Sequence, residues 1–447
     1  WQLLEPADQD VLAALSAFPG TFTAVAAQAV AGASLFDLDT LCEKSLLQQQ
    51  QEDERYGMHS LVRHFAAEKL AVRAPAVDRA FVAHFHEFAH DHQTDYAALQ
   101  PEWHNLLTAV RKAHALEHWS QVFELVQVLA QPWRRKIRFN DMREGLTLAV
   151  DAVSKLADPP ALAQLLLRLG EVETELNDYA AAEAHLAAAM QRFMRLEHGP
   201  GIAETKYFYG RIKNEQAQDQ QALQLFEEAR RLFAEENDLP GVAKCLNYIA
   251  GCYMRQQPDF QLARAYLEQA RSLQHNLPGS STYVETLRYL ARIKLNAGEF
   301  AAAEADLIEA SAVAQAQHDV GDYAAVLFER MVLCKKRDQM DAAVQFGYEC
   351  LDHFKELGSL RWEALIKIQL AILHQTLQAP DRALVLLQEG LRIFEELADL
   401  LEQAHAHYWL HKLYADLNEP EKSRQAKETA VGLNASLQNP WLAQLLA

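Results

Sequence analysis

The sequence has 447 residues, half of them hydrophobic and 23% charged, so it can bury a large core. Its 42 basic and 61 acidic residues give a net charge of −19, which argues against binding of nucleic acid or anionic membranes by the chain as a whole. Five scattered cysteines without a CxxC motif indicate a reducing, cytoplasmic setting, and the lack of any run of 18 apolar residues predicts no membrane span.

Residues 1–72 are expected to form a small winged-helix module. Apolar residues at helical spacing predict helices over 8–18, from about 23 to 30, over 35–44 and over 61–70. Pro19 and Gly20 end the first of these, and Thr21 or Thr23 can cap the second. Two short strands, 45–49 and 55–58, are expected between the third and fourth helices, with the glutamine run near the tip that joins them.

Residues 73–120 are expected to form a helical bridge. Residues 121–447 are expected to form a series of helical hairpins with a period of about 40 residues. Small residues recur at this period in three columns, and we interpret them as points where two helices cross closely. The columns are Gly170, Gly210, Gly251, Ala291, Met331, Ala371 and His411; Ala182, Ala222, Ala263, Ala303, Ala343, Ala383 and Ser423; and Ala189, Ala229, Ala270, Ala310, Cys350, Gly390 and Ala430. Gly145 and Ala152 extend the pattern upstream, so about eight hairpins are expected to stack into an all-α solenoid.

The columns resemble the small-residue positions of the tetratricopeptide repeat. That resemblance implies a superhelix in which the first helix of each hairpin lines a concave groove. The period of about 40 residues, against 34 in that family, predicts longer helices.

The chain as a whole resembles the C-terminal region of bacterial signal-transduction ATPases with numerous domains (STAND), of the AfsR-like type. RYGMHSLVRHFAAEKL is similar to the winged helix after the NB-ARC nucleotide-binding domain, and PEWHNLLTAVRKA to the bridge into the repeats. The family implies an ATPase that binds ADP or ATP with magnesium and is held off by its repeats until a ligand binds. It then self-oligomerises and activates an N-terminal effector, in transcription regulation or antiphage defence.

The chain begins at Trp1, so we expect it to be part of a longer protein whose nucleotide-binding domain lies upstream. No Walker A motif (GxxxxGK[ST]) occurs in the 447 residues. We therefore expect this chain not to be an enzyme and to need no cofactor of its own.

Met58-His59-Ser60 occupies the position of the family's Met-His-Asp motif, whose histidine contacts the ADP phosphate. The resemblance implies a nucleotide-sensing role for His59, because an imidazole can donate to a phosphate. Ser60 replaces the aspartate and cannot orient the ring as a carboxylate would. The alternative is a partly exposed histidine at the end of a strand.

A basic and aromatic stripe is the main candidate for ligand binding. Carried over one position at a time, the groove-lining positions of the family select Tyr207, Arg211, Asn214, Tyr248, Arg255, Arg288, Arg292, Asn296, Lys335 and Lys336. Arginine offers paired donors to a carboxylate or phosphate, and tyrosine offers rigid contact area. The stripe predicts a surface for a protein, peptide or small-molecule trigger. The alternative is that these charges pair with Glu204, Glu215 and Glu285 and only solvate the groove.

His86-Glu87-Phe88-Ala89-His90 matches the HExxH signature of zinc hydrolases. Two histidines four residues apart share one helix face, and Glu87 is the candidate general base. No third ligand is evident from the sequence, so a His-rich solvated face is the alternative. A constitutive tetratricopeptide scaffold, for which His59 is dispensable, is the other alternative function.

Overall fold

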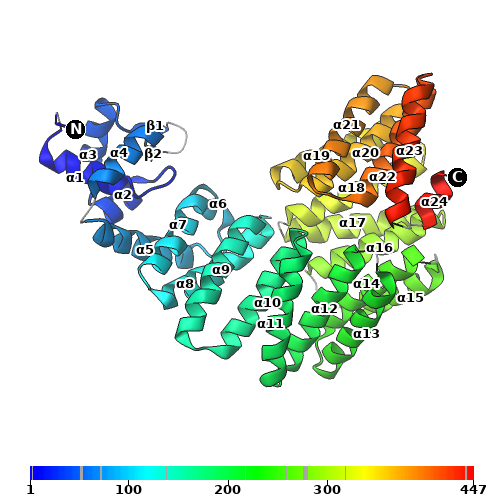
Figure 1. Ribbon diagram of the computed structural model, residues 1–447, viewed down its shortest axis with the longest axis horizontal. Helices are drawn as coiled ribbons and strands as arrows, with labels where there is room; N and C mark the ends of the chain where they lie inside the picture. Colours follow the sequence, from blue (N-terminus) through cyan, green and yellow to red (C-terminus); the bar gives the residue numbers. More distant parts are fainter. Residues whose placement is uncertain are drawn as a thin grey trace. The chain divides into compact units, whose positions relative to one another are not determined.

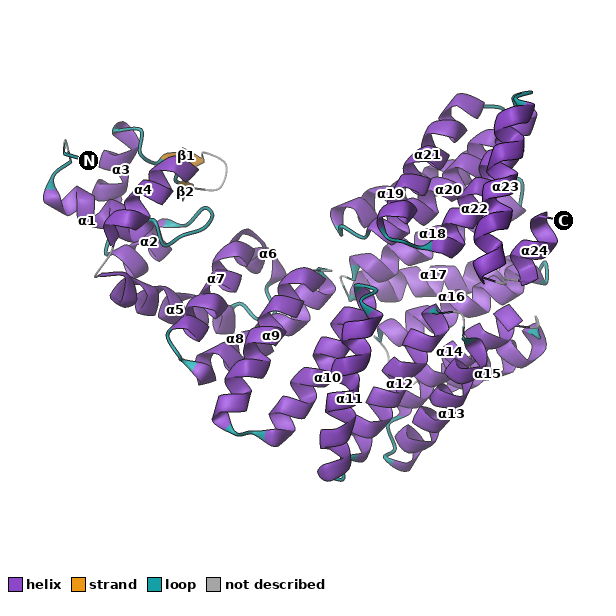
Figure 2. Cartoon of the chain, viewed as in Figure 1, coloured by secondary structure: helices purple, strands orange, loops and turns teal. Residues whose placement is uncertain are grey.

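The computed structural model describes residues 1–2, 4–50, 54–70, 73–136, 138–216, 218–256, 259–274, 280–317, 319–437 and 440–446. The chain forms two compact units, Trp1–Ile212 and Lys213–Ala447, which are taken one at a time (Figure 1). Both units consist of helices, and the two strands of the described residues lie in the N-terminal part (Figure 2).

Unit 1 begins with four helices and a β-hairpin. Thr23 caps the second helix by accepting a hydrogen bond from the N–H of Ala26 at 3.2 Å. The two strands are antiparallel, and an isolated bridge joins Phe22 to Tyr56. The order of these elements agrees with the prediction, whereas residues 51–53, at the expected tip, lie outside the described residues. The elements are α1 (Pro6–Leu15), α2 (Ala24–Ala31), α3 (Leu35–Glu43), β1 (Gln48–Gln50), β2 (Arg55–Gly57) and α4 (Ser60–Leu70).

The next segment consists of α5 (Ala74–Asp91), α6 (Tyr96–Leu99), η2 (Gln100–Glu102) and α7 (Trp103–Ala115). A buried ion pair joins it to β2: Arg55 Nη1 lies 2.5 Å from Glu102 Oε1, and the two side chains are 6% and 4% exposed. One hydrophobic core runs from Leu12 to Val172 and includes residues of α1 to α7. Because the core is continuous, the boundaries expected near residues 72 and 120 stay predictions.

Paired helices of mostly 15 to 18 residues make up the rest of the chain. In unit 1, α8 packs against α9 and α10 against α11; in unit 2, the pairs are α14 with α15, α16 with α17, α18 with α19, α20 with α21 and α22 with α23. The predicted all-α chain of helical hairpins is therefore confirmed. The helices are α8 (Trp119–Arg135), α9 (Phe139–Leu156), α10 (Pro159–Glu175), α11 (Tyr179–Arg195), α12 (Gly199–Glu215), α13 (Asp219–Glu235), α14 (Leu239–Gln256), α15 (Phe260–Gln274), α16 (Ser281–Asn296), α17 (Phe300–Ala316), α18 (Val320–Lys336), α19 (Met340–Glu356), α20 (Leu360–Thr376), α21 (Pro380–Glu396), α22 (Leu400–Asp416), α23 (Pro420–Leu437) and α24 (Pro440–Leu446).

Residues in the left-handed conformation turn the chain between many of the helices. Between α10 and α11, Asn177 adopts φ of 59°, a left-handed conformation that asparagine tolerates well. Asp178 then caps α11 by accepting a hydrogen bond from the N–H of Ala181 at 3.3 Å. Asn418 has the same φ of 59° after α22. At Asn177 and Asp178, two consecutive polar residues therefore both reverse the chain and cap the next helix.

The small-residue columns mark close helix crossings, as expected. Ala182 and Ala189 are fully buried in α11, and a Cβ added to Gly170 of α10 would lie 2.7 Å from Cγ of Leu186. Gly251 is an exception, because a Cβ there would meet nothing closer than Arg255 Nη1 at 3.9 Å. Close approach therefore explains the glycine at 170 but not the one at 251.

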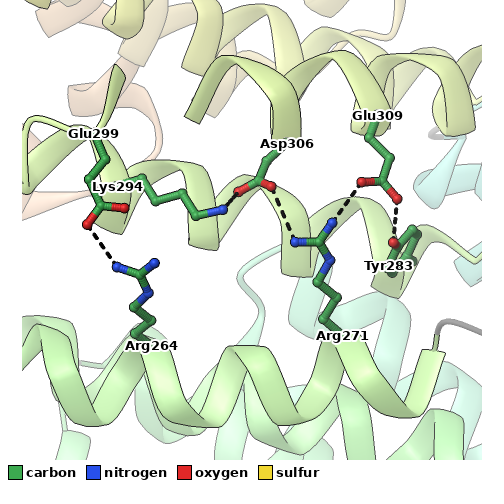
Figure 3. Close-up of polar contacts among 7 residues, drawn as sticks. All are labelled: Arg264, Arg271, Tyr283, Lys294, Glu299, Asp306 and Glu309. Atoms are coloured by element: carbon green, nitrogen blue, oxygen red, sulfur yellow. Dashed lines mark hydrogen bonds and ion pairs between the residues drawn. The ribbon is translucent and has the colours of Figure 1, made fainter. Parts of the chain in front are cut away.

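Ion pairs join successive hairpins within unit 2 (Figure 3). Arg271 of α15 reaches Asp306 of α17 at 3.5 Å and Glu309 at 3.0 Å, and Lys294 of α16 lies 2.5 Å from Asp306. Burial raises the pKa of Asp306, while its bond to Lys294 lowers it. Figure 3 shows the whole group, which consists of Arg264, Arg271, Tyr283, Lys294, Glu299, Asp306 and Glu309.

Among the helices of the described residues, none is by itself both long and apolar enough to cross a membrane. Only α2 and α3 taken together meet that criterion of length and composition, and they are bent by 103°.

Candidate ligand-binding surface and other predicted sites

His59 lies between β2 and α4, and its side chain is exposed. Its Nδ1 accepts a hydrogen bond from the backbone N–H of Leu61 at 3.3 Å. Because Nδ1 acts as an acceptor there, the neutral ring carries its proton on Nε2. The local fold thus holds His59 as a potential donor at a solvent-exposed helix start.

Tyr207 and Arg211 are the part of the predicted stripe that lies in unit 1, both on α12. Tyr207 is buried, with its ring centroid 5.2 Å from that of Phe208. Arg211 Nη1 lies 2.7 Å from Glu175 Oε1 of α10. Burial raises the pKa of Glu175, but the Arg211 guanidinium outweighs it and the pKa is lowered overall. These two residues pack and pair within unit 1.

Asn214, Tyr248 and Arg255 belong to unit 2. Arg255 of α14 lies 2.7 Å from Asp219 at the start of α13 and also donates to the side-chain oxygen of Asn214. The ring of Tyr248 packs on that of Phe226, with centroids 5.1 Å apart. Asp219 thus neutralises the guanidinium of Arg255, which the sequence analysis predicted to bind a ligand.

Arg288 and Arg292 of α16 converge on one buried carboxylate, Glu329 of α18. The Glu329 side chain is 1% exposed; Arg292 donates to it directly, and Arg288 Nη2 lies 3.9 Å away. The Nε of Arg288 is buried and has no hydrogen-bond partner among the described residues. Both arginines are therefore parts of the contact between α16 and α18.

Asp322, in the first turn of α18, is a second acid near this cluster, and it is half-buried. Burial and the neighbouring Asp319 raise its pKa to about 7, although a hydrogen bond from Ser281 and the charge of Arg288 lower it. Its Oδ2 has no hydrogen-bond partner within the described ranges. Burial thus makes the Asp322 carboxyl much easier to protonate than an exposed aspartate.

Asn296 lies at the C-terminal end of α16, and Lys335 and Lys336 lie at the C-terminal end of α18. Asn296 and Lys336 are exposed, and Lys335 is half-buried. Burial and the charge of Lys336 lower the pKa of Lys335. In the part of the chain that the structure describes, neither lysine has a carboxylate within ion-pair distance. The C-terminal end of α18 is therefore the part of the stripe whose positive charge is not used internally.

The first helices of the hairpins in unit 2, here called the A helices, are α14, α16, α18, α20 and α22. The first three form one layer, because α16 packs against both α14 and α18; α20 packs against α22. The stripe residues of unit 2 from Tyr248 onward lie on three of them. This layer can bind an anionic ligand through the lysine side chains of α18. Its neighbouring helices add side-chain amides and aromatic rings.

The sequence predicted the basic residues of the stripe but not their partners. The acids that pair with them are Glu175, Asp219 and Glu329, whereas Glu285 accepts a hydrogen bond from Asn247 at 3.2 Å. These arginine–acid pairs are 36 or 37 residues apart, which is the period of about 40 less one helical turn. A search for opposite charges at that spacing would have found them.

His86 and His90 lie on one face of α5, as the HExxH spacing predicts, with ring centroids 4.8 Å apart. The structure adds a third residue that the sequence did not reveal: Glu124 of α8, whose Oε2 lies 2.7 Å from His86 Nε2. Glu87 is exposed and does not belong to this group. The three residues His86, His90 and Glu124 can therefore be brought onto one ion.

Four of the five cysteines are buried thiols. All five are free, and all except Cys42 are buried. Burial raises the pKa of Cys252 to about 11 and that of Cys350 to about 12, so both stay protonated at neutral pH.

Comparison with known proteins agrees with this arrangement of helices. A tetratricopeptide repeat family profile matches residues 161–235. No curated protein matches the chain. Among solved structures, the whole chain is similar to 66% of a STAND protein with a tetratricopeptide repeat sensor from Pyrococcus horikoshii, at 15% identity and a TM-score of 0.52. The chain thus spans less than two thirds of that protein.

Two shorter proteins are similar to most of this chain. One is a Rap protein solved in complex with competence and sporulation factor. The match covers 75% of this chain and 98% of the Rap chain, at 14% identity and a TM-score of 0.52. The other is the apo quorum sensor NprR from B. thuringiensis, for which the match covers 73% of this chain and 97% of the NprR chain, at 13% identity and a TM-score of 0.51. At these identities the likeness shows the fold alone, a series of tetratricopeptide-like hairpins.

Proposed function

We propose that this chain is the ligand-sensing region of a STAND-type signal-transduction ATPase and that the A helices of unit 2 bind the trigger. One observation carries the choice of surface. Lys335 and Lys336 have no carboxylate partner among the described residues, whereas Arg255 and Arg292 on the neighbouring A helices each have one. A half-buried lysine without a counter-charge is costly, and an anionic group of a ligand would offset that cost.

The chemistry of the layer favours a peptide or protein ligand with an acidic group. Lysine supplies the charge, while Asn296 and the surrounding helices offer polar and apolar contacts over several turns. The likeness to a Rap protein bound to competence and sporulation factor, and to the quorum sensor NprR, supports a ligand of this kind. A small acidic molecule is the other class that this surface can recognise.

Coupling to a nucleotide switch belongs to the same proposal. His59 holds an exposed Nε2–H, which is the donor that a phosphate oxygen of ADP requires. ADP or ATP with magnesium, self-oligomerisation and an N-terminal effector, in transcription regulation or antiphage defence, would belong to the longer protein. The free thiols and the absence of a Walker A motif support a cytoplasmic sensor region without ATPase activity of its own.

The test is native mass spectrometry of the chain after incubation with lysate from its own organism. We expect the wild type to retain an added mass that the double variant K335E/K336E loses. Arg424→Glu, on the exposed face of α23, is the matched charge-reversal control and should keep the ligand. Equal retention by the double variant would refute this surface.

The internal pairing of the arginines gives a reason to avoid the more obvious variants. Arg288→Glu and Arg292→Glu would each place a second carboxylate beside buried Glu329 and disturb the contact between α16 and α18. Loss of binding in such variants would report on folding as much as on recognition. The internal pairing is also what a constitutive scaffold would show, and in that case His59→Ala would leave signalling by the full-length protein unchanged.

A further inference from the structure

Two helices of unit 1 bring three metal-ligating side chains together outside the surface described above. His86 and His90 extend from α5, and Glu124 extends from α8, which packs against α5. One ligand atom from each of the three lies within 4.8 Å of the other two. The His86 side chain is 23% exposed and that of Glu124 is 49% exposed, so an ion can reach them from solvent.

We propose that His86, His90 and Glu124 form a binding site for one divalent transition-metal ion, with zinc the best fit. Two imidazole nitrogens and one carboxylate oxygen are a ligand set that zinc takes, with a fourth position left for water. In tetrahedral geometry, with bonds of about 2.0–2.2 Å, ligand atoms are about 3.4 Å apart. The closest pair here, at 2.7 Å, has to open by less than an ångström, and the widest has to close by little more than one.

A plain hydrogen bond between His86 and Glu124 does not account for the whole arrangement. The His90 ring lies beside that of His86 at an interplanar angle of 57°, yet among the described residues His90 has no hydrogen-bond or ion-pair partner. A second imidazole adds nothing to a histidine–carboxylate pair, but it completes a set of three ligands. The i and i+4 spacing on α5 gives both rings the same direction.

The flanking histidines do not compete for the ion. His92 Nδ1 hydrogen-bonds to the carbonyl oxygen of Phe88 at 2.9 Å, and its ring stacks on that of Phe88. His84 packs edge-on against Phe85 and does not belong to the group of three. Of the four histidines between 84 and 92, the geometry thus selects two.

A metal at this position would connect the helical bridge to the first hairpin, because α5 and α8 belong to different segments of unit 1. Binding to both helices would oppose their separation. Glu87, the general base of the HExxH signature, is not among the three grouped side chains. We therefore assign the site a binding role that links two helices, separate from the proposed trigger surface in unit 2.

The test uses the full chain without a histidine tag, stripped of metal with a chelator and dialysed. We expect isothermal titration with Zn²⁺ to give one ion per chain, and Co²⁺ to give the visible absorption bands of a four-coordinate site. His86→Ala and His90→Ala should each weaken Zn²⁺ binding by at least about 100-fold, and Glu124→Ala by at least about 10-fold. The melting temperature of each metal-free variant shows whether it is folded.

His64→Ala is the matched control, because His64 is also an exposed helical histidine of unit 1 with an acid, Glu68, four residues away at 3.7 Å. It should bind Zn²⁺ as the wild type does. The proposal is overturned if the double variant H86A/H90A keeps wild-type stoichiometry and affinity. It is also overturned if the wild type binds no Zn²⁺ at about 100 μM, far above the concentrations that fill zinc sites in folded proteins.

Discussion

Glu329 makes a sharp test of how the repeats are held together. In Glu329→Gln the side chain keeps its size but loses its charge, and Arg288, whose side chain is 11% exposed, becomes a buried cation without a counter-charge. Breaking a buried ion pair costs about 3–5 kcal/mol. Two features reduce that value here: Arg288 lies 3.9 Å from the carboxylate, and Arg292 is 40% exposed and can be solvated. We therefore expect a loss of about 2–3 kcal/mol in local stability.

Hydrogen exchange followed by mass spectrometry can measure this loss of local stability in individual helices. A change of 2–3 kcal/mol accelerates exchange through local opening by about 30- to 150-fold. The acceleration should appear in peptides from α16 and α18. Glu421→Gln is the control, since the Glu421–Arg424 pair is exposed and should contribute less than about 0.5 kcal/mol. If exchange in α16 and α18 is the same in Glu329→Gln as in the wild type, the pair does not stabilise the contact and this reasoning is wrong.

Three further predictions concern pH, packing and metal. The pKa of Asp322 is about 7 in the folded chain, above its ordinary value of 3.8, so folding takes up a proton between these values and stability should fall as pH rises through that range. Between pH 5 and pH 8, urea unfolding should show that the free energy of unfolding falls by about 1–2 kcal/mol more in the wild type than in Asp322→Asn. An equal fall in both proteins would contradict the raised pKa of Asp322. Gly170→Ala should lower the free energy of unfolding by about 1–2 kcal/mol, because its Cβ would lie 2.7 Å from Leu186. Gly251→Ala, which has open space around it, should raise the free energy of unfolding by about 0.5–1 kcal/mol. If urea unfolding shows changes of the same sign in both variants, the argument from close crossings is wrong. Zn²⁺ at 100 times its dissociation constant should stabilise the wild type by about 2.7 kcal/mol and raise its melting temperature, with no such rise in His90→Ala.

The hairpins could be predicted from the sequence because close crossings impose a local, periodic requirement. Alanine at 182 and 189 is fully buried, as a crossing demands, and the same holds at 303 and 310. Gly251 shows the limit of that argument, since a small residue can occupy a crossing column without being crowded. Periodicity identifies the column but not the distance across it.

The partners of the charged residues cannot be predicted from one repeat alone and require a comparison of neighbouring repeats. The sequence placed Arg292 on a ligand-binding face, yet its carboxylate, Glu329, lies on the next A helix. Such a pairing depends on how far one hairpin is rotated relative to the next, which the sequence of a single repeat does not contain. Glu124 was missed for a related reason, because the ligand lies on a different helix, 38 residues after His86.

One measurement tests the central claim most directly: hydrogen exchange of the full chain with and without the peptide fraction of a lysate from its own organism. The account predicts slower exchange at the C-terminal ends of α16 and α18 in the wild type. It predicts no such protection in K335E/K336E, and unchanged exchange in the outer helix α23. Protection that survives the double variant, or that falls on α23 in place of α16 and α18, would contradict the proposal that the A helices of unit 2 bind the trigger.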